Sequence, residues 1–267
     1  MDLQDARIIS NRMLAPGYYR MELECGPPLT AAVPGQFVMV LIDGGGRGPF
    51  WRRPFSVAGL VCREGRVCGI ELVYKVVGRG TAAMAAMAAG KLVSLLGPLG
   101  RGFDVSGDPD PLFLAAGGIG IAPMVFLARS LEERGHRGRR LFFLGGRGKA
   151  DLLCLARLER LDLELHLATD DGSAGHAGPL TGPMAEAAAK GPPQLICACG
   201  PPGMLRAVAR MAAEHCCPCQ VAVETLMACG MGACQGCALP ETGGSGFYLH
   251  ACRDGPVFDA SRIVIPG

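Results

Sequence analysis

E-T-L-M-A-C-G-M-G-A-C-Q-G-C, at residues 224–237, carries three cysteines in a regular spacing. They are Cys229, Cys234 and Cys237, and Cys252 follows after fourteen intervening residues. The pattern C-x4-C-x2-C with a distant fourth cysteine is typical of a plant-type [2Fe-2S] cluster, which four thiolates ligate. Glycines between the cysteines let the backbone turn tightly and bring its N–H groups close to sulfur. The sequence therefore predicts a [2Fe-2S] cluster ligated by these four cysteines.

A structural zinc site is the main alternative for the same cysteines. Structural zinc prefers two C-x2–4-C pairs, and here only Cys234 and Cys237 form a pair of that kind. The loop to Cys252 is short, and glycines on either side of Gly244 predict a hairpin that returns the chain to it. The spacing and the interleaved glycines favour the iron–sulfur interpretation.

The chain has 267 residues, nearly half of them hydrophobic, which is enough for two domains and a small appendage. Its net charge of only +2 argues against a nucleic-acid or membrane-surface partner. The opening residues lack the charged and apolar regions of a secretory signal, and thirteen cysteines without such a signal indicate reduced thiols in the cytoplasm. Residues 111–128 carry no charge, but their glycines and Pro123 argue against a membrane span.

Short apolar segments separated by glycine and proline turns fill residues 1–105. They are rich in valine, isoleucine, tyrosine and phenylalanine, which favour strands, and many short strands at this spacing predict a small antiparallel β-barrel. An alanine- and methionine-rich segment at 81–89 predicts one short helix, and we interpret 97–103 as mainly a turn that closes the barrel. The expected strands span 7–14, 18–25, 35–42, 55–60 and 69–77.

Two motifs within the predicted barrel carry polar groups suited to a phosphate-containing ligand. Arg53 begins R-P-F-S, and an arginine beside a strand can bind a pyrophosphate through both arms of its guanidinium. V-Y-K-V-V-G-R-G-T runs from a strand into a helix start, where N–H groups face an anion. A lone arginine on a strand is more often a surface ion pair, but the two motifs together fit a flavin nucleotide. The candidate flavin-binding residues are Arg53, Pro54, Phe55, Ser56, Val73, Tyr74, Lys75, Gly80 and Thr81.

Strands alternate with helices between residues 106 and 223, which predicts a doubly wound parallel sheet. Ligands of such sheets bind at the carboxyl ends of the strands. A basic run from Arg134 to Arg140 follows the first helix, and we expect an exposed loop there. The expected strands are 111–116, 141–144, 163–168, 194–198 and 220–223. One expected helix follows the first strand and ends near 134, and three more span 152–160, 183–190 and 202–215.

Two glycine-rich turns in this region end strands and open helices. G-G-I-G-I-A-P begins at Gly117 and C-G-P-P-G-M begins at Cys199, and a phosphate binds well at such helix starts. The first turn has Pro123 in place of the third glycine of the Rossmann fingerprint, so a purely structural turn stays an alternative. Arg147 follows the second strand, and NADH and NADPH both stay open. The candidate nicotinamide-nucleotide residues are Gly117, Gly118, Gly120, Pro123, Cys199, Gly200 and Pro201.

These motifs resemble the ferredoxin–NADP reductase-like family over nearly the whole chain. R-P-F-S is similar to the family's flavin motif, and the two glycine-rich turns are similar to its nicotinamide motifs. Within the family, the electron-transfer subunits of NAD-linked (class 1B) dihydroorotate dehydrogenases are most similar, through V-Y-K-V-V-G-R-G-T, G-P-L-G-R-G-F and the ending H-A-C-R-D-G-P-V-F-D. Small subunits of transhydrogenases and sulfide dehydrogenases share D-G-P-x-F-D but tend to replace the first cluster cysteine by aspartate, whereas Cys229 is a cysteine.

The resemblance implies a β plus α/β architecture of three parts. These are an FAD-binding β-barrel at 1–105, an NAD-binding α/β domain at 106–223 and a [2Fe-2S] module at 224–267. It also implies a partner, an FMN-containing dihydroorotate dehydrogenase catalytic subunit, with two copies of each chain in the complex. Dihydroorotate is then oxidised in the partner, and no residue of that step is expected here.

In this relay, electrons pass from the partner through the cluster and FAD to NAD. Arg53 would hold the FAD pyrophosphate and Ser56 would bond the flavin. Gly117–Gly120 would seat the NAD diphosphate, and Cys199 would lie near the nicotinamide as a packing group. The alternative is a flavin reductase subunit of another system, of the NAD(P)H–ferredoxin, sulfide-dehydrogenase or transhydrogenase type.

Overall fold

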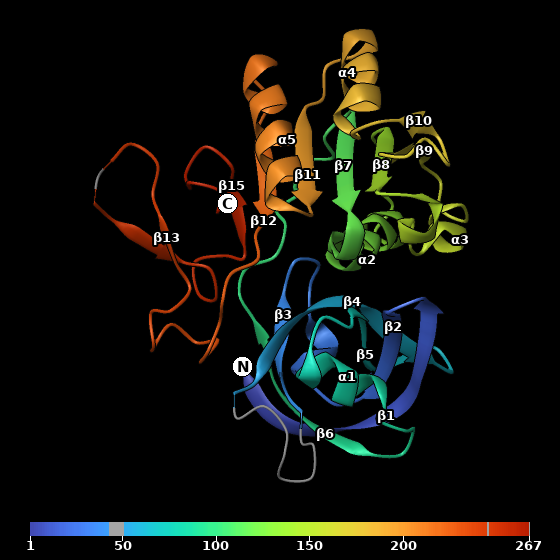
Figure 1. The fold of residues 1–267 in the computed structure, drawn as a ribbon, viewed down its shortest axis with the longest axis vertical. Coiled ribbons are helices and arrows are strands. Elements are labelled where there is room, and N and C mark those ends of the chain that lie inside the picture. The colour runs from blue at the N-terminus through green and yellow to red at the C-terminus, as the bar shows by residue number, and fades with distance from the viewer. Residues whose placement is uncertain (43–50, 245, 267) are drawn as a thin grey trace.

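Six antiparallel strands close into a barrel in the N-terminal part of the chain (Figure 1), which confirms the predicted barrel. The computed structural model describes residues 1–42, 51–244 and 246–266. Around the barrel the strands follow the order β1-β2-β5-β4-β3-β6. Apolar side chains from the strands fill the barrel interior. The elements are β1 (Asp2–Ala15), β2 (Tyr18–Glu24), η1 (Leu29–Ala31), β3 (Phe37–Leu41), β4 (Arg53–Arg63), β5 (Arg66–Lys75), α1 (Arg79–Ala85) and β6 (Leu92–Leu99).

The segment interpreted as a turn at 97–103 is in part the closing strand of the barrel. Gly97 pairs with Asp2 of β1, and Leu99 pairs with Phe37 of β3. A Cβ atom at Gly97 would lie 2.8 Å from Cγ1 of Val38, so the glycine permits a close approach of two strands rather than a bend. The turn prediction was therefore wrong for residues 97–99.

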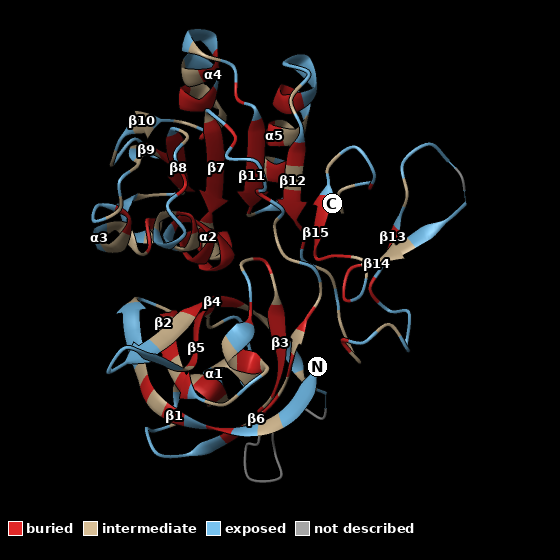
Figure 2. Cartoon of the chain, turned by 180° about the vertical axis from the view of Figure 1, so that it is seen from behind, coloured by how far each residue is buried: buried red, intermediate tan, exposed pale blue. Residues whose placement is uncertain are grey.

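A seven-stranded sheet forms the second part of the molecule, in the order β10-β9-β8-β7-β11-β12-β15. Figure 2 shows its central strands buried, because helices cover both faces. Helices α4 and α5 pack on one face, and α2 and α3 pack on the other, which confirms the doubly wound prediction. The elements are β7 (Leu112–Gly117), η2 (Gly118–Gly120), α2 (Ile121–Glu133), β8 (Arg140–Gly146), η3 (Lys149–Asp151), α3 (Leu155–Leu158), β9 (Glu164–Thr169), β10 (His176–Ala177), α4 (Thr181–Lys190), β11 (Leu195–Cys199), α5 (Pro202–Glu214), β12 (Cys219–Ala222) and β15 (Val257–Asp259).

The C-terminal segment lies beside this sheet and adds a strand to it (Figure 1). Its hairpin consists of β13 (Ala238–Pro240) and β14 (Tyr248–His250), as the glycines around residue 244 predict. Strand β15 then pairs antiparallel with β12, so the sheet continues beyond residue 223. The cluster module and the sheet therefore share hydrogen bonds as well as a core.

Two local expectations fail between α2 and β9. The helix expected at 152–160 is only α3, preceded by the short turn η3. The basic run is not wholly exposed, because His136 and Arg140 are 7% exposed. Arg140 donates to the carbonyl of Asp162 and His136 contacts the carbonyl of Gly138 at 3.2 Å, so polar partners inside the fold hold both side chains.

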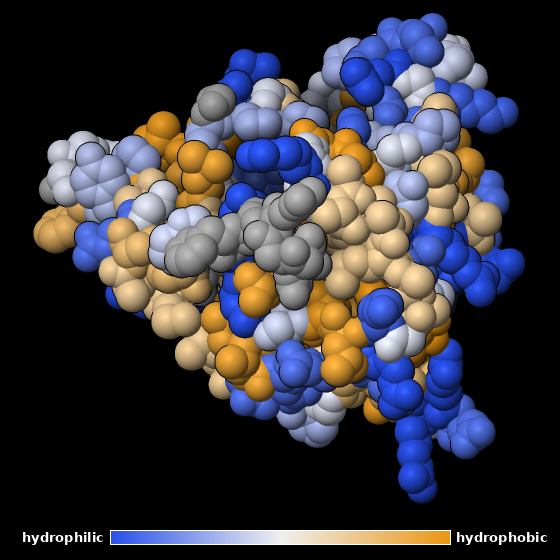
Figure 3. Space-filling view, turned by 60° about the horizontal axis from the view of Figure 1, so that its bottom comes forward, coloured by the Kyte–Doolittle hydropathy of each residue, from blue (hydrophilic) through white to orange (hydrophobic). Residues whose placement is uncertain are grey.

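Apolar side chains also appear on the outside of the barrel. Figure 3, seen from the barrel end, shows hydrophobic residues scattered among polar ones on this face. Exposed large apolar residues of the barrel include Leu3, Trp51 and Leu92. None of the helices in the described ranges is long and apolar enough to cross a membrane.

Candidate functional site

A cavity of about 990 Å³ lies where the barrel faces the second domain. Strands β4 and β5 and the start of α1 form one side of it, and Ile119 and Ala122 from the other domain form another. All nine residues predicted to bind the flavin line this cavity: Arg53, Pro54, Phe55, Ser56, Val73, Tyr74, Lys75, Gly80 and Thr81. Its size is in the range of cofactor sites.

The two neighbouring arginines at the start of β4 contact different parts of the molecule. Arg52 turns back onto the barrel, where its guanidinium donates to the carbonyl and hydroxyl of Ser94 at 2.9 and 3.0 Å. Arg53 is exposed and lines the cavity, and among the described residues its guanidinium makes only long hydrogen bonds, at 3.3 and 3.4 Å, to the carbonyls of Trp51 and Arg52. Arg53 is therefore the arginine that can reach a phosphate.

The strand-to-helix turn after β5 is fixed by Thr81. The Thr81 hydroxyl accepts from the N–H groups of Val77 and Gly78 at 2.9 and 3.2 Å and donates to the Gly78 carbonyl. Within β5, the Tyr74 hydroxyl donates to Asn11 at 2.9 Å, and burial raises the pKa of Tyr74 to about 12. Both contacts hold the cavity wall in place.

A second cavity, of about 680 Å³, lies at the carboxyl ends of the parallel strands. Gly117, Gly118 and Gly120 line it from the first glycine-rich turn, and Gly200 and Pro201 line it from the second. This is where ligands bind in open parallel sheets.

Two predicted residues, Pro123 and Cys199, do not line this cavity. Pro123 is buried within α2, and Cys199 is 4% exposed at the end of β11. Burial raises the pKa of Cys199 well above its ordinary value, so the thiol stays protonated. A Cβ atom at Gly120 would overlap the Cys199 backbone, so the two turns touch directly behind the cavity.

The cavities meet at four residues that line both: Lys75, Ile119, Val223 and Glu224. The sequence patterns singled out only Lys75 among them. Glu224 is exposed where it lines the cavities, yet the surrounding protein desolvates it and raises the pKa of its carboxyl group. It lies two residues beyond the end of β12, the last parallel strand, and that position near a strand end was the available signal.

Tyr18 and Asp151 also line the second cavity and were missed. They come from different domains, and the Tyr18 hydroxyl donates to Asp151 Oδ1 at 2.9 Å. The other carboxylate oxygen of Asp151 accepts from Arg147 Nε at 3.3 Å. No sequence motif marks this contact, because it joins residues 133 positions apart.

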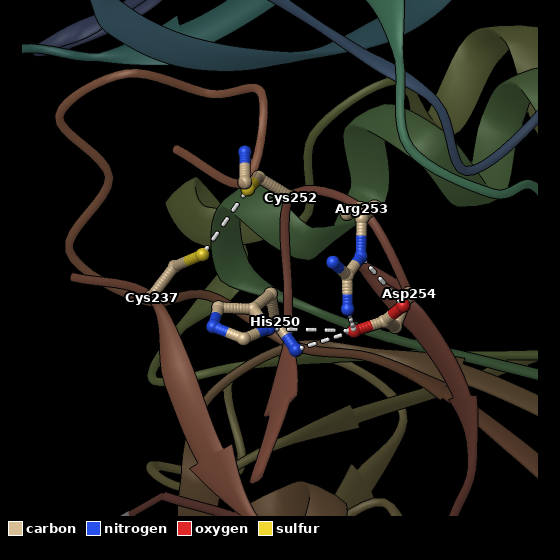
Figure 4. A network of polar contacts seen from close by, with 6 residues as sticks. Cys237, His250, Cys252, Arg253 and Asp254 are labelled. Atoms are coloured by element: carbon tan, nitrogen blue, oxygen red, sulfur yellow. Dashed lines mark hydrogen bonds and ion pairs between the residues drawn. The ribbon is translucent and has the colours of Figure 1, made fainter. Parts of the chain in front are cut away.

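The four predicted cluster ligands lie as two close pairs. The Sγ atoms of Cys237 and Cys252 are 3.2 Å apart, and both residues are buried (Figure 4). Cys234 approaches Cys229, whose sulfur accepts the backbone N–H of Cys234 at 3.4 Å. In the part of the chain that the structure describes, no three cysteine, histidine or carboxylate side chains surround a single metal position. Two pairs suit a two-iron cluster, since each iron takes two of the four protein ligands.

One short loop joins the two cysteine pairs. The backbone N–H of Met231 donates to Cys229 Sγ at 3.4 Å, and the next N–H, of Gly232, donates to Cys252 Sγ at 3.1 Å. Partial burial of Cys229 opposes ionisation, but N–H donors from Cys234 and Met231 lower its pKa to about 6. A thiolate is the form that ligates metal. Gly232 has a φ of +83°, a conformation that glycine adopts without strain.

An ion-pair network braces the end of this module (Figure 4). Arg253 donates to both carboxylate oxygens of Asp254 at 3.0 and 3.1 Å. Asp254 also accepts a hydrogen bond from the backbone N–H of His250 at 2.8 Å. The hydrogen bonds from Arg253 and His250 lower the pKa of the Asp254 carboxyl group. The network fixes the backbone on both sides of Cys252.

Two family models match the chain. The iron-sulfur cluster binding domain of dihydroorotate dehydrogenase B matches residues 224–264, and an oxidoreductase NAD-binding domain matches residues 114–210. The matched segments contain the cysteine pairs and both glycine-rich turns.

Solved structures share the arrangement of barrel and sheet. A structure of an NADH-dependent reduced ferredoxin-NADP oxidoreductase covers 97% of this chain and 90% of its own, with a TM-score of 0.83 and 26% identity. A ferredoxin NADP+ reductase from Neisseria gonorrhoeae with bound FAD and NADP covers 80% and 92%, with a TM-score of 0.66 and 15% identity, which is a likeness of fold alone.

Curated relatives match over almost the full length. The dihydroorotate dehydrogenase B (NAD(+)) electron transfer subunit of Desulforamulus reducens is 36% identical over 261 residues, covering 97% of each chain. That of Enterococcus faecalis is 34% identical over 264 residues, again covering 97% of each. A probable subunit from Methanopyrus kandleri is 40% identical over 84% of this chain and 78% of its own. The chain therefore belongs to the family of dihydroorotate dehydrogenase B (NAD(+)) electron transfer subunits.

Proposed function

We propose that this chain passes electrons from a partner subunit that oxidises dihydroorotate to NAD, through a [2Fe-2S] cluster and FAD. The observation that carries the proposal is the junction of the two cavities at Lys75, Ile119, Val223 and Glu224. A flavin in one cavity and a nicotinamide in the other can come into contact there. FAD, when bound, supplies the conversion between single electrons and a hydride.

In the first cavity, Arg53 binds the FAD pyrophosphate and Ser56 bonds the flavin. The support for these roles is that Arg53 lines the cavity while Arg52 is occupied by Ser94. Gly80 and Thr81 bind phosphate oxygens through their N–H groups, on a turn that the Thr81 hydroxyl has already fixed. The remaining predicted residues, Pro54, Phe55, Val73, Tyr74 and Lys75, shape the wall.

In the second cavity, Gly117, Gly118 and Gly120 seat the NAD diphosphate at the start of α2. Gly200 and Pro201 complete the site from the other turn. Pro123 and Cys199 act from behind the cavity wall, as packing groups. The buried, protonated thiol of Cys199 suits packing and is unsuited to nucleophilic attack.

The cluster ligands are Cys229 and Cys234 on one iron and Cys237 and Cys252 on the other. Their support is the pairwise arrangement and the N–H donors of Met231 and Gly232. Replacing Cys229 by Ser should lower iron content and remove cluster absorbance while FAD stays bound. Cys62→Ser, an exposed cysteine on β4, is the matched control. A normal cluster in the Cys229 variant would exclude this ligand set.

Three domains, 1–105, 106–223 and 224–267, carry FAD, NAD and the cluster in that order, with β15 tying the third to the second. The chain assembles with an FMN-containing catalytic subunit, two copies of each. We place it in the cytoplasm, a reducing compartment that suits thirteen cysteines.

The deciding experiment is to co-express the chain with a dihydroorotate dehydrogenase catalytic subunit and purify both without oxygen. The expected result is a stable complex with bound flavin and two irons per copy of this chain, which reduces NAD when dihydroorotate is added. A chain that binds both cofactors but neither joins that partner nor supports the reaction would contradict the proposal.

A second candidate is a flavin reductase subunit of the NAD(P)H–ferredoxin, sulfide-dehydrogenase or transhydrogenase type. It is favoured by the likeness to the NADH-dependent reduced ferredoxin-NADP oxidoreductase structure, which extends over 97% of this chain. It predicts ferredoxin-dependent rather than dihydroorotate-dependent reduction in the same preparation.

A further inference from the structure

Strand β5 presents one face to the barrel interior and the other to the α/β domain. Ile70, Leu72 and Tyr74 belong to the barrel core. Successive side chains of a strand point to opposite faces, so Glu71, Val73 and Lys75 point outward. On neighbouring β2, Tyr18 pairs directly with Lys75. The outward face therefore forms a row of contacts with the second domain.

Val73 and Glu71, the middle and far end of this row, do not line the second cavity, which is the proposed nicotinamide cavity. Val73 packs with Ala58 against Ala122 of α2. Glu71, whose side chain is 5% exposed, accepts both arms of the Arg157 guanidinium at 2.5 and 2.7 Å. Bidentate arginine–carboxylate pairs hold a fixed geometry. Arg157 belongs to α3, so this contact anchors α3 to the barrel.

The near end of the row reaches both cavities. The Tyr18 hydroxyl bonds Asp151, and Lys75 Nζ lies 4.8 Å from the centre of the Tyr18 ring. Asp151 and its partner Arg147 line the second cavity, and Lys75 lines both. Tyr18 thus connects Asp151, in the wall of the second cavity, to Lys75, at the junction of the two cavities.

We propose that the Tyr18–Asp151 hydrogen bond is a positioning contact that aligns the nicotinamide with the flavin. The inference rests on the proposed function, since it requires FAD and NAD in the two cavities. The η3–α3 segment, residues 149–158, is held to the barrel by this bond and by the Glu71–Arg157 pair. Of these two contacts, only the Tyr18–Asp151 bond involves residues that line the nicotinamide cavity. Its loss lets that wall shift relative to Lys75, while the groups that bind NAD stay intact.

The kinetic test uses Tyr18→Phe, which removes the hydroxyl but keeps the ring. In the FAD-loaded complex, stopped-flow mixing with NADH gives the rate constant of flavin reduction and the dissociation constant of NADH. The variant should reduce its flavin about 2- to 10-fold more slowly, the equivalent of one hydrogen bond, with NADH affinity within about twofold of wild type. Tyr19→Phe, the adjacent tyrosine, which stacks on Tyr74 at 5.6 Å, should match wild type.

The second test needs no turnover. Hydrogen exchange of the backbone amides at 149–158, measured without NADH, should be faster in Tyr18→Phe than in wild type or Tyr19→Phe. Wild-type exchange or a wild-type rate of flavin reduction in Tyr18→Phe would overturn the inference. So would a rate loss matched by an equal loss of NADH affinity. A wild-type complex whose flavin NADH does not reduce would instead overturn the proposed function.

Discussion

At the scale of single residues, identical residue types next to each other have different environments. Arg52 bonds Ser94 within the barrel, and its neighbour Arg53 lines the cavity. Arg53 begins β4, whereas Arg52 lies just before that strand. Tyr18 and Tyr19 of β2 also differ, because consecutive side chains of a strand lie on opposite faces, and it is Tyr18 that bonds a residue of the other domain.

Replacing Arg53 by Ala should weaken FAD binding. A charged hydrogen bond to a pyrophosphate contributes about 1.5–3 kcal/mol, so the variant should purify with much less flavin per chain, measured by visible absorbance. Arg63→Ala removes an exposed arginine from the other end of β4 and should keep full flavin content. Full flavin content in Arg53→Ala would contradict its assigned role.

His136 makes stability depend on pH. Its side chain is 0% exposed, and burial lowers its pKa below the ordinary 6.5, although Asp108 nearby opposes this. The unfolded chain therefore binds a proton near pH 6.5 that the folded chain does not. Stability is present above that pH and falls as pH drops below it. The free energy of unfolding is measured by denaturant melts at pH 7.5 and at about pH 5.5. Its decrease between the two pH values should be smaller in His136→Asn than in wild type, because the variant has no imidazole to protonate. An equal decrease would contradict the prediction.

At the scale of elements, the two glycine-rich turns work as one unit. A Cβ atom at Gly120 would overlap the Cys199 carbonyl and lie 2.7 Å from the Gly200 N atom. A Cβ atom at Gly117 would lie 2.6 Å from Met204 Sδ. The starts of α2 and α5 therefore pack so closely that only glycine fits between them, which leaves their N–H groups at one edge of the sheet.

Gly120→Ala should push the two turns apart. Overpacking of this kind costs about 1–3 kcal/mol, so we expect a lower melting temperature and weaker NADH binding, measured by calorimetry and titration. Gly203→Ala is the matched control, because Gly203 lines the same cavity but a Cβ atom there meets nothing within 4 Å. Equal behaviour of the two variants would show that close packing is not the reason for Gly120.

At the scale of the whole molecule, the cluster module is not an independent appendage. Cys237 and Cys252 belong to the same hydrophobic core as Phe113 and Ile196 of the sheet. A Cβ atom at Gly230 would lie 2.6 Å from Cγ of Met39, so the cysteine loop also packs on the barrel. The barrel, the sheet and the C-terminal module therefore all meet around the cysteine loop.

Phe258→Ala should destabilise the sheet and the cluster module together. Phe258 is 6% exposed and belongs to their common core, and removing a buried phenylalanine costs about 3–5 kcal/mol. Thermal unfolding followed by circular dichroism and by cluster absorbance should shift by the same amount. Leu226→Ala, at a site 90% exposed, should leave both unchanged within about 0.5 kcal/mol. Separate transitions would contradict a shared core.

The sequence alone determined those features that depend on short-range chemistry. Cysteine spacing predicted a cluster site of four cysteines, glycines after strands predicted the turns at the second cavity, and R-P-F-S predicted residues that line the first cavity. Alternation of strand segments predicted the barrel, and strand–helix alternation predicted the sheet. Each of these rests on residues close together in the chain, where backbone geometry limits the outcomes.

The tertiary structure alone decided the features that join distant residues. Gly97 and Pro98 have the composition of a turn, yet they lie in β6, because this strand pairs with both β1 and β3 and so closes the barrel. His136 and Arg140 have the composition of an exposed loop, yet partners elsewhere in the fold bury them. The Tyr18–Asp151 contact spans 133 positions and the β12–β15 pairing bridges two modules. Local preference is weak against the burial and hydrogen bonding that such contacts bring, so no pattern within one segment predicts them.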